Sequence, residues 1–521
     1  MKKQQKASKK AKNGFMRVVF SRTGMVLLLI LVQLLIFFLL PYYYGSKKEY
    51  IYSAYTVLSV LVIIWIMNRE DNPAFKLTWI LFVVVVPVAG SLAYILVDTQ
   101  LKHNPIKRRL AKEKIDSDSC MEQDEDAVRA LWASNASNSL LSYYLSTRLD
   151  FPTYRNTEAT YYTVGEEFFP ALIAELNKAK SFIFLEYFII DQGYMWSVIL
   201  KILRQKAKEG VEVRVMYDGM NSIQNLPHNY PKRLERYGIK CRIANPIAPF
   251  LSTVQNNRDH RKICVIDGNV AFTGGVNLAD EYINRKKRFG KWKDTAIMLK
   301  GDAVSSFTVL FLQSWNTYGK AENEYAHYIR PKQTGFRREL GYMIPYADNP
   351  YDGESVGEEV YFHILNHAKH YVHIMTPYLI LDHEMLRTLT RVAKSGIEVA
   401  IIMPHIPDKW YAFVLAQTYY EELIKSGVQI YEFEPGFVHA KVFVSDDNTA
   451  TVGSVNLDYR SLYLHFECGV FIYNNSEIFR IEEDFQNTLK ECHKVTLMEV
   501  RQRTLLTKIA GNLLRLVAPL M

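Results

Sequence analysis

The chain has few cysteines for its length, and they show no pairing pattern. Its 521 residues include five, which are Cys120, Cys241, Cys264, Cys468 and Cys492. The number is odd and no C-x2-C pair occurs, which argues against a disulfide framework or a structural zinc site and favours a reducing compartment. We interpret Cys264 and Cys468, which lie near the motifs described below, as small buried strand residues rather than nucleophiles.

The first 22 residues contain no acidic residue. They carry eight basic ones, Lys2, Lys3, Lys6, Lys9, Lys10, Lys12, Arg17 and Arg22, in a chain whose net charge is +9. Such a run suits anionic lipid and nucleic acid equally well. It is also typical of a solvated tail that sets membrane topology, and we expect residues 1–23 to form a basic cytoplasmic tail.

No signal-peptide cleavage site follows the first long apolar stretch, and two further stretches come after it. The three are Met25–Leu40, Ile51–Met67 and Leu77–Val97. The first and third are long enough to cross a hydrocarbon core of about 30 Å. The second is shorter and begins with polar and aromatic residues, so it could span marginally or lie shallow. We expect a transmembrane segment of two or three apolar helices at residues 24–100.

Basic residues also follow the apolar stretches, at 102–114. Because loops rich in Lys and Arg stay in the cytoplasm, two cytoplasmic flanks require an even number of spans between them. Three full spans would place the soluble region outside. We expect an even number, and therefore a multi-pass bacterial membrane protein whose soluble region is cytoplasmic.

The soluble region uses one motif twice. Residues 260–277 read HRKICVIDGNVAFTGGVN and residues 439–456 read HAKVFVSDDNTATVGSVN, and both fit H-x-K-x4-D-x6-G-x2-N. The first copy holds His260, Lys262, Asp267, Gly274 and Asn277, and the second holds His439, Lys441, Asp446, Gly453 and Asn456. An imidazole, a fixed cation and an amide at constant spacing are suited to binding a phosphate.

The surroundings of the motif repeat as well. A continuous apolar run, a helix-like stretch, a glycine and a second strand-like run occur in that order in both halves. The two glycines, Gly210 and Gly396, are 186 positions apart, and the histidines of the two motifs are 179 apart. Near-constant offsets indicate two copies of one α/β domain. We expect a charged linker at residues 101–150 and the domains at 151–335 and 336–521.

Within each motif, apolar and polar residues alternate with the period of a strand. His439 and Lys441 therefore point to the same face of that strand, side by side. The next strand brings back the glycine and the asparagine. In the first copy, Thr273–Gly274–Gly275 keeps the backbone low, so that an anionic group can approach closely.

Two related His-Lys pairs suggest half-sites of one centre on either side of a bound phosphate. One neutral imidazole would attack phosphorus while the other, protonated, donates to the leaving alkoxide. At neutral pH this requires the two histidines to be driven to different states, and a carboxylate on one ring nitrogen would do so. Glu467 is placed for this in the second half, and Asp294 is its counterpart in the first. Lys262 and Lys441 would hold non-bridging oxygens, with Asn277 and Asn456 donating hydrogen bonds. The scheme needs no metal and no cofactor.

The paired motifs resemble those of the phospholipase D superfamily. The apolar N-terminal segment, the continuations GGVNLADEY and GSVNLDYRS, and the segment TPYLI resemble bacterial cardiolipin synthases over nearly the whole chain. The resemblance implies duplicated phospholipase D-like α/β/α sandwich domains forming a pseudo-twofold unit, preceded by a transmembrane helical segment. It implies transfer of a phosphatidyl group from one phosphatidylglycerol to another, which gives cardiolipin and glycerol.

The resemblance also implies the active-site residues, which are His260, Lys262, Asp267, His439, Lys441 and Asp446. Within them, His260 would be the nucleophile and His439 the acid and base, while the motif aspartates would support the structure of the site. Gly275 stands where the second copy has Ser454. A hydroxyl that contacts the phosphate would then be missing on one side, so we expect the two halves to be inequivalent.

Three function classes stay open from the residues alone. They are a lipid transferase, a phospholipase D-type hydrolase acting on lipid or nucleic acid, and a non-catalytic membrane scaffold. The intact motifs disfavour a scaffold, and membrane anchoring favours phospholipid over nucleic acid as the partner. The oligomeric state stays open.

Two further features have competing interpretations. A metal site at His363, His367, His370 and His373 is disfavoured, because a passage from helix to strand would scatter these side chains. The apolar C-terminal stretch Thr504–Met521 could be an amphipathic helix resting on the membrane or could pack against the core.

Overall fold

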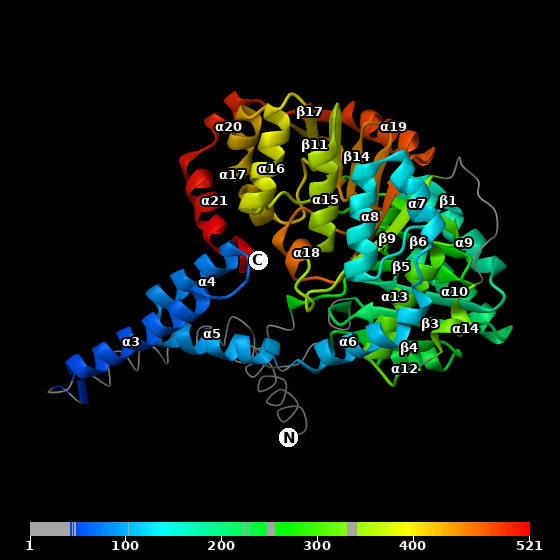
Figure 1. Cartoon of the computed structure of the whole chain (residues 1–521), viewed down its shortest axis with the longest axis horizontal. Helices are drawn as coiled ribbons and strands as arrows, with labels where there is room; N and C mark the ends of the chain where they lie inside the picture. Colours follow the sequence, from blue (N-terminus) through cyan, green and yellow to red (C-terminus); the bar gives the residue numbers. More distant parts are fainter. Residues whose placement is uncertain are drawn as a thin grey trace, which may run out of the picture. The chain divides into compact units, whose positions relative to one another are not determined.

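The structure is a computed structural model, shown in Figure 1. It describes residues 42–43, 45, 48–102, 104–221, 225–227, 229–246, 256–322, 324–330 and 341–520. The chain divides into two compact units. One comprises Met1–Asn104 with the short stretches 247–256 and 519–521, and the other comprises 105–246 and 257–518.

The first unit contains one helix long enough to be a membrane span. The three helices are α3 (Lys48–Met67), α4 (Pro73–Val85) and α5 (Pro87–Lys102). Among the described residues, only Glu49–Met67 of α3 is long and apolar enough to cross a membrane. This helix contains the second apolar stretch, which the sequence predicted to span the membrane only marginally or to lie shallow. The stretch Met25–Leu40 lies outside the described residues, so the multi-pass topology and the cytoplasmic orientation stay predictions.

The third apolar stretch, Leu77–Val97, is not one continuous helix, because it is divided between α4 and α5. Pro87 has no N–H to continue the helix, and the preceding Val86 leaves the helical region, with φ −130° and ψ 71°. The two resulting helices pack on α3 through a small buried cluster of Val62, Ile66, Val83 and Tyr94.

Residues 105–149, expected as a linker, form three helices of the second unit. They are α6 (Pro105–Ser117), α7 (Glu125–Ser134) and α8 (Ala136–Leu149). Asp124 caps α7 by accepting hydrogen bonds from two backbone N–H groups. The Asn138 side chain of α8 contacts His363 at 2.8 Å. The acidic composition of 116–126 thus marks a helix boundary.

The second unit contains two large sheets. The strands of the first are β1 (Thr157–Tyr162), β2 (Phe182–Tyr187), β3 (Glu212–Asp218), β4 (Lys240–Ala244), β5 (Lys262–Ile266), β6 (Val270–Gly274) and β8 (Ala296–Gly301). The strands of the second are β9 (Tyr342–Asp348), β10 (Tyr371–Met375), β11 (Glu398–Pro404), β12 (Gln429–Phe433), β14 (Val442–Ser445), β15 (Thr449–Gly453), β16 (Glu467–Tyr473) and β17 (Cys492–Lys494).

The two sheets have the same topology, which confirms the duplicated α/β unit. The first runs β1-β8-β6-β5-β2-β3-β4, and the second runs β9-β16-β15-β14-β10-β11-β12, with β17 added at its edge. Among the seven strands that the two sheets share, two neighbouring pairs are parallel and the other four are antiparallel. The additional strand β17 pairs antiparallel with β12. The motif strands β5 and β14 are central in both.

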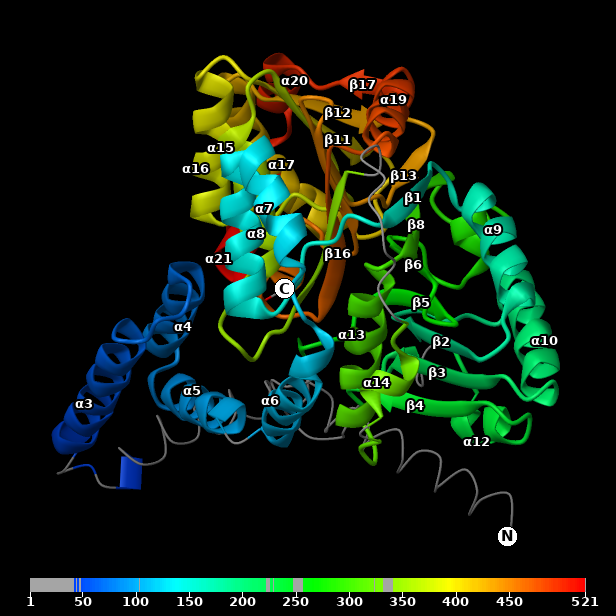
Figure 2. The same cartoon turned by 45° about the vertical axis from the view of Figure 1, so that its right-hand side comes forward.

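Helices cover both faces of each sheet (Figure 2). In the first domain α9 (Gly165–Lys178) and α10 (Tyr194–Lys208) lie on one face, while α13 (Val304–Thr317) and α14 (Tyr325–Tyr328) lie on the other. Its remaining short helices are η4 (Asp280–Ile283) and α12 (Tyr230–Glu235). The second domain has α15 (Val356–His367), α16 (His383–Lys394), α17 (Trp410–Lys425), α18 (Tyr459–Tyr463), α19 (Glu477–Leu489), α20 (Leu497–Gln502) and α21 (Leu505–Val517).

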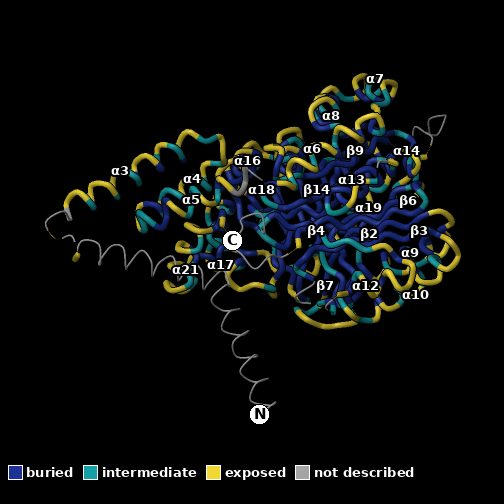
Figure 3. The backbone as a smooth tube through the Cα atoms, turned by 90° about the horizontal axis from the view of Figure 1, so that it is seen from below, coloured by how far each residue is buried: buried dark blue, intermediate teal, exposed yellow. Residues whose placement is uncertain are grey.

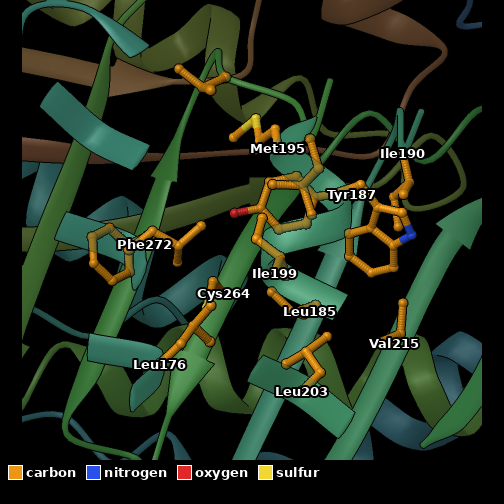
Figure 4. Close-up of a cluster of buried hydrophobic side chains, with 14 of the residues drawn as sticks. Leu176, Leu185, Tyr187, Ile190, Met195, Ile199, Leu203, Val215, Cys264 and Phe272 are labelled. Carbon is orange, nitrogen blue, oxygen red and sulfur yellow. The ribbon is translucent and has the colours of Figure 1, made fainter. Parts of the chain in front are cut away.

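Burial on both faces explains why the central strands lack alternation. In β2, Leu185 and Tyr187 join the cluster under α9 and α10 (Figure 4), while Phe184 stacks on Phe311 of α13 at 4.6 Å between ring centroids. All six residues of β2 are buried, as expected for a strand covered on both sides. The central strands of both sheets are buried in Figure 3, and the motif strands β5 and β14 are buried at every residue.

Candidate active site

The two His-Lys pairs lie at the starts of the central strands β5 and β14, as the alternation predicted. His260 and His439 are each 7% exposed, and Lys262 and Lys441 are 1% exposed. Each lysine Nζ donates a hydrogen bond to the backbone carbonyl of the histidine two residues earlier. Both pairs are therefore fixed, buried groups at the same end of equivalent strands.

Each histidine is paired with a carboxylate of the other domain. His260 Nδ1 lies 2.8 and 2.9 Å from the two carboxylate oxygens of Glu467. His439 Nδ1 lies 2.6 Å from Oδ2 of Asp294. The sequence singled out both acids but assigned each to the histidine of its own half, and that assignment is wrong.

Backbone pairing between the domains explains the exchange. Two short strands, β7 (Lys291–Lys293) and β13 (Gly436–Val438), pair in parallel with Val438 opposite Lys293. The next residues on the two strands are His439 and Asp294. In the same way Asp259 pairs in parallel with Phe466, and the next residues are His260 and Glu467. Each histidine N–H donates to the carbonyl of the residue before its acid, at 2.9 Å for His260 and 2.7 Å for His439.

The surroundings of the two acids differ. Glu467 also accepts hydrogen bonds from the hydroxyls of Ser454 and, at 2.7 Å, of Ser461. Ser454 therefore orients the acid rather than reaching toward the substrate, which corrects the role expected for its hydroxyl. Besides His439, Asp294 accepts a hydrogen bond from the backbone N–H of Thr295 at 2.9 Å.

Gly275 makes room for Asp294. A Cβ at position 275 would lie 2.0 Å from Asp294 Oδ1, so serine cannot occupy the place that Ser454 takes in the second copy. Gly275 therefore leaves space for the carboxylate of Asp294. The sequence had suggested that it leaves space for a bound anion. The two halves therefore differ, as expected, and they differ in the contacts of their carboxylates, Glu467 and Asp294.

The two imidazoles favour the neutral form. Burial lowers the pKa of His260 to about 3, against the opposing charge of Glu467. Burial, with the nearby cations of Lys441 and Lys262, lowers the pKa of His439 well below its ordinary value. Both shifts have the same direction, so the expectation that the histidines are driven to different states does not hold for the protein without substrate.

The pKa values of the two carboxyl groups, in contrast, shift in opposite directions. Burial raises the pKa of Asp294 to about 6, against Lys441. Burial acts in the same direction on Glu467, but His260 and Lys262 outweigh it and hold the pKa of Glu467 below its ordinary range. Burial lowers the pKa of Lys262 to about 8 and that of Lys441 to about 7. Lys262 lowers the pKa of Lys441 and His439, which lie in the other domain, so the half-sites share one electrostatic environment.

Aromatic rings enclose the imidazoles unequally. Phe188 contacts His260 edge to face at 4.9 Å between ring centroids. His439 is surrounded by the rings of Trp292, Tyr282 and Phe437, at 5.3, 5.5 and 5.9 Å. These neighbours exclude water from both rings, which accounts for the lowered pKa values.

The sequence reasoning missed His465. Its ring lies 5.5 Å from that of His260, and its Nδ1 lies 3.6 Å from Glu467. Within the described part of the chain, His260, His465 and Glu467 are the only group of at least three ligand-type side chains close enough to hold a metal ion. Glu467 already accepts hydrogen bonds from His260, Ser454 and Ser461, so an ion there would have to break them. The signal was the position of His465 two residues before Glu467, just ahead of strand β16.

The side chains of the two motif asparagines differ in their hydrogen bonds. The side chain of Asn277 accepts from the Ile189 N–H at 2.9 Å and donates to the Tyr282 hydroxyl at 2.7 Å. It therefore positions Tyr282 beside His439, and the predicted donation to phosphate is not what the structure shows. The Oδ1 atom of Asn456 is buried with no hydrogen-bond partner among the described residues. This oxygen is an acceptor, so it suits a substrate hydroxyl and not a phosphate oxygen.

The motif aspartates lie at the far ends of β5 and β14 from the imidazoles. Asp267 comes five residues after Lys262, about 16 Å along an extended strand. Its carboxylate accepts three backbone N–H groups at the start of β2, those of Lys180, Ser181 and Phe182, at 2.7–2.9 Å. Asp446 does the same for Lys369, His370 and Tyr371 before β10. These contacts agree with the structural role that the resemblance implies for both aspartates.

We expect Asp267→Asn to lower the free energy of unfolding by about 1–3 kcal/mol, because one amide oxygen replaces a carboxylate that accepts three N–H groups. Asparagine tolerates the left-handed backbone at this position, where φ is 54°. Thermal unfolding of the purified protein would measure the loss, and activity per folded molecule should change little. Asp446→Asn is the matched control in the second domain and should behave alike. A large fall in kcat with unchanged unfolding would contradict the structural role.

The four histidines between 363 and 373 do not assemble. His363 contacts Asn138, His367 contacts the carbonyl of His363, and His373 contacts Glu482 on α19. His363 and His367 share a face of α15, with ring centroids 4.2 Å apart. Because α15 ends at His367 and β10 begins at Tyr371, the change from helix to strand separates this pair from His373, as the sequence predicted.

Comparison with known proteins places this geometry in a family. The profile described as cardiolipin synthase, phospholipase D-like domain, matches residues 172–306 and 361–489. These matches include both motifs and most strands of each sheet. The chain belongs to the cardiolipin synthase family of phospholipase D-like proteins. A second profile, described as phospholipase D-nuclease N-terminal, matches residues 57–97 in the apolar unit.

Relatives in this family match along most of the chain. A cardiolipin synthase of Geobacillus kaustophilus is 33% identical over 479 residues, covering 90% of this chain and 94% of the relative. Cardiolipin synthase 2 of Bacillus anthracis is 34% identical, covering 90% and 91%. An uncharacterized protein of Streptococcus mutans is 48% identical, covering 88% and 99%.

A solved structure shares the fold. The phosphatidylserine synthase of Haemophilus influenzae superimposes with a TM-score of 0.55 at 14% sequence identity, covering 74% of this chain and 98% of that one. At this identity the likeness supports the duplicated domain architecture alone.

Proposed function

We propose that this protein is a cardiolipin synthase, a phosphatidyltransferase that joins two phosphatidylglycerol molecules and releases glycerol. The observation that carries the proposal is the pair of His–carboxylate contacts formed between the domains, each beside a buried lysine. The reciprocal pairing supports a single centre on a pseudo-twofold axis between domains at 151–335 and 336–521. The names of the relatives support phosphatidylglycerol as the substrate.

In the first step Nε2 of His260 attacks the phosphorus of one phosphatidylglycerol. A P–N bond forms and the P–O bond to the glycerol headgroup breaks. The His439–Asp294 pair holds one additional proton, and His439 gives a proton from Nε2 to the departing oxygen. In the second step neutral His439 takes the proton from a hydroxyl of another phosphatidylglycerol. That oxygen attacks phosphorus, the P–N bond breaks, and cardiolipin leaves with His260 restored.

The unequal carboxylates support this division of roles. Ionised Glu467 accepts the Nδ1 proton of His260, which leaves the Nε2 lone pair for attack. Asp294, with its pKa of about 6, takes a proton more readily than Glu467. The His439–Asp294 pair is therefore better suited to hold the additional proton that the leaving oxygen needs.

The two buried lysines support phosphate binding. A phosphodiester carries one negative charge, and Lys262 and Lys441 supply buried cations on both sides of it. The anion in turn favours the charged forms of these lysines, whose pKa values burial lowers to about 8 and about 7. Water as the acceptor would make the same residues a phospholipase D-type lipid hydrolase, which is the second candidate function.

Incubation of the purified protein with phosphatidylglycerol vesicles tests the proposal. The expected products are glycerol and a four-chain lipid in equal amounts, with no requirement for added metal. Phosphatidic acid as the sole lipid product would sink the transferase assignment. The His260→Ala protein serves as the control for contaminating lipid-modifying enzymes.

A further inference from the structure

The C-terminal helix α21 is attached to the second domain by one side. Gly511 lies against Thr418 and Val414 of α17, where an added Cβ would meet Thr418 at 2.6 Å. The guanidinium of Arg515 sits over the Tyr419 ring at 4.5 Å, and Arg503 donates to the Gln417 carbonyl at 3.1 Å. Figure 1 shows α21 beside α17 at the outer edge of the domain.

The opposite side of α21 presents apolar side chains to solvent. Its exposed large hydrophobic residues are Leu505, Leu506, Ile509, Leu513, Leu516 and Val517, with Leu506 80% and Leu513 61% exposed. The spacing of three to four residues puts them on one stripe along the helix. Gly511 is the one buried residue of α21, so the helix appears largely exposed in Figure 3. Packing against the core, the alternative left open by the sequence, accounts for only the side that faces α17.

The same segment carries charge of one sign. Residues 501–521 contain Arg501, Arg503, Lys508 and Arg515 and no acidic residue. At the start of α17, the helix that α21 packs on, Trp410 is 66% exposed. An apolar stripe flanked by cations, with a tryptophan nearby, is the composition of a helix that lies in the interface of an anionic bilayer.

We propose that α21 lies in the plane of an anionic membrane surface, with its apolar stripe inserted among the acyl chains and its basic residues at the headgroups. The apolar helix α3 supplies a bilayer tether on the same chain. Residues 501–521 carry four basic residues and no acidic one, and although Arg501 pairs with Glu421 of α17 at 3.4 Å, the remaining positive charge favours anionic lipid over a second copy of α21, which would carry the same charge. This contact fixes which side of the second domain faces the lipid, and it does not depend on the chemistry at His260.

Depth measurement on the full chain tests the proposal. A polarity-sensitive fluorophore is attached at Leu513→Cys after the partly exposed Cys120, Cys241 and Cys492 are replaced by serine. The protein is reconstituted in vesicles of phosphatidylcholine and phosphatidylglycerol in roughly equal parts, with and without chain-brominated lipid. The matched control is Phe479→Cys on α19, because Phe479 is also 61% exposed.

The label at position 513 should show blue-shifted emission and strong quenching by brominated lipid, while the label at 479 shows neither. Equal, solvent-like emission at both positions would overturn the proposal. A blue shift at 513 without lipid quenching, accompanied by crosslinking between copies through that cysteine, would overturn it in favour of self-association.

Kinetics give a second measurement. The double change Ile509→Glu and Leu513→Glu should raise KM for phosphatidylglycerol in vesicles several-fold with little change in kcat, whereas Phe479→Glu should have no effect. In detergent micelles the double variant should match the wild type, which shows that it is folded. An unchanged KM in vesicles would contradict the proposal even if the enzyme proves to be a hydrolase.

Discussion

Replacing His260 with alanine should lower the transfer rate at least about ten-thousandfold and leave no covalent lipid on the protein, because the attacking nitrogen is gone. His439→Ala should be impaired about a hundred- to ten-thousandfold, the usual contribution of a general acid and base. It should nevertheless form a phosphatidyl-enzyme at His260 that turns over slowly. Acid-labile labelling of the two variants with radioactive phosphatidylglycerol measures the difference.

His373→Ala is the matched control for the loss of a buried imidazole. His373 is also held by a carboxylate, Glu482, at 2.9 Å, and it lies on the α19 side of the second sheet. This variant should keep most of its activity per folded molecule. Label on the His260→Ala protein, with none on His439→Ala, would reverse the assignment of the nucleophile.

Glu467→Gln should lower the transfer rate about a hundred- to ten-thousandfold, with little change in KM. The amide carries no negative charge, so it accepts the hydrogen bond from His260 Nδ1–H more weakly. Its N–H₂ group also favours the imidazole tautomer with the proton on Nε2, which cannot attack. Loss of the orienting acid has the same effect in other His–carboxylate pairs. Because Glu467 contacts His260, covalent labelling in a His439→Ala background should disappear when Glu467→Gln is added. Labelling yields of the single and double variants measure this coupling.

Asp294→Asn in the same His439→Ala background is the control that tests the exchange between domains. Asp294 contacts His439, so once that histidine is absent the further change should have little effect on labelling. Ser461→Ala removes one hydrogen bond to Glu467 and should cost less than about tenfold, since the charge of the acid remains. If Asp294→Asn abolished labelling while Glu467→Gln did not, the exchanged pairing would be wrong.

The duplicated α/β unit could be predicted because it depends on order along the chain. Strand-like runs, Gly210 and Gly396 at the helix ends, and the constant offsets all repeat within each half. The membrane segment was harder to predict. Composition marks Leu77–Val97 as a single long apolar run, but the conformation at Val86 and Pro87 divides it, and this local backbone effect outweighs hydropathy.

The motif predicts most of the residues in the site, but it does not predict their hydrogen-bond partners. Spacing along a strand places His260 beside Lys262 and His439 beside Lys441. It cannot reveal that Asp267 and Asp446 turn to backbone N–H groups at the far ends of those strands. Nor can it show that the Asn277 side chain accepts a hydrogen bond from the Ile189 N–H and donates one to the Tyr282 hydroxyl. Those contacts depend on how the chain folds back around the motif.

The sequence by itself determined the family, the duplicated domains, and the imidazoles and lysines of the centre, since these follow from residue type and spacing. Only the tertiary structure decided which acid serves which histidine. His260 and Glu467 are 207 positions apart, and His439 and Asp294 are 145 apart. Their pairing is set by the parallel contacts between the domains, at β7 with β13 and at Asp259 with Phe466. The same packing gives Gly275 its function, since the space that it leaves is filled by the carboxylate that orients His439.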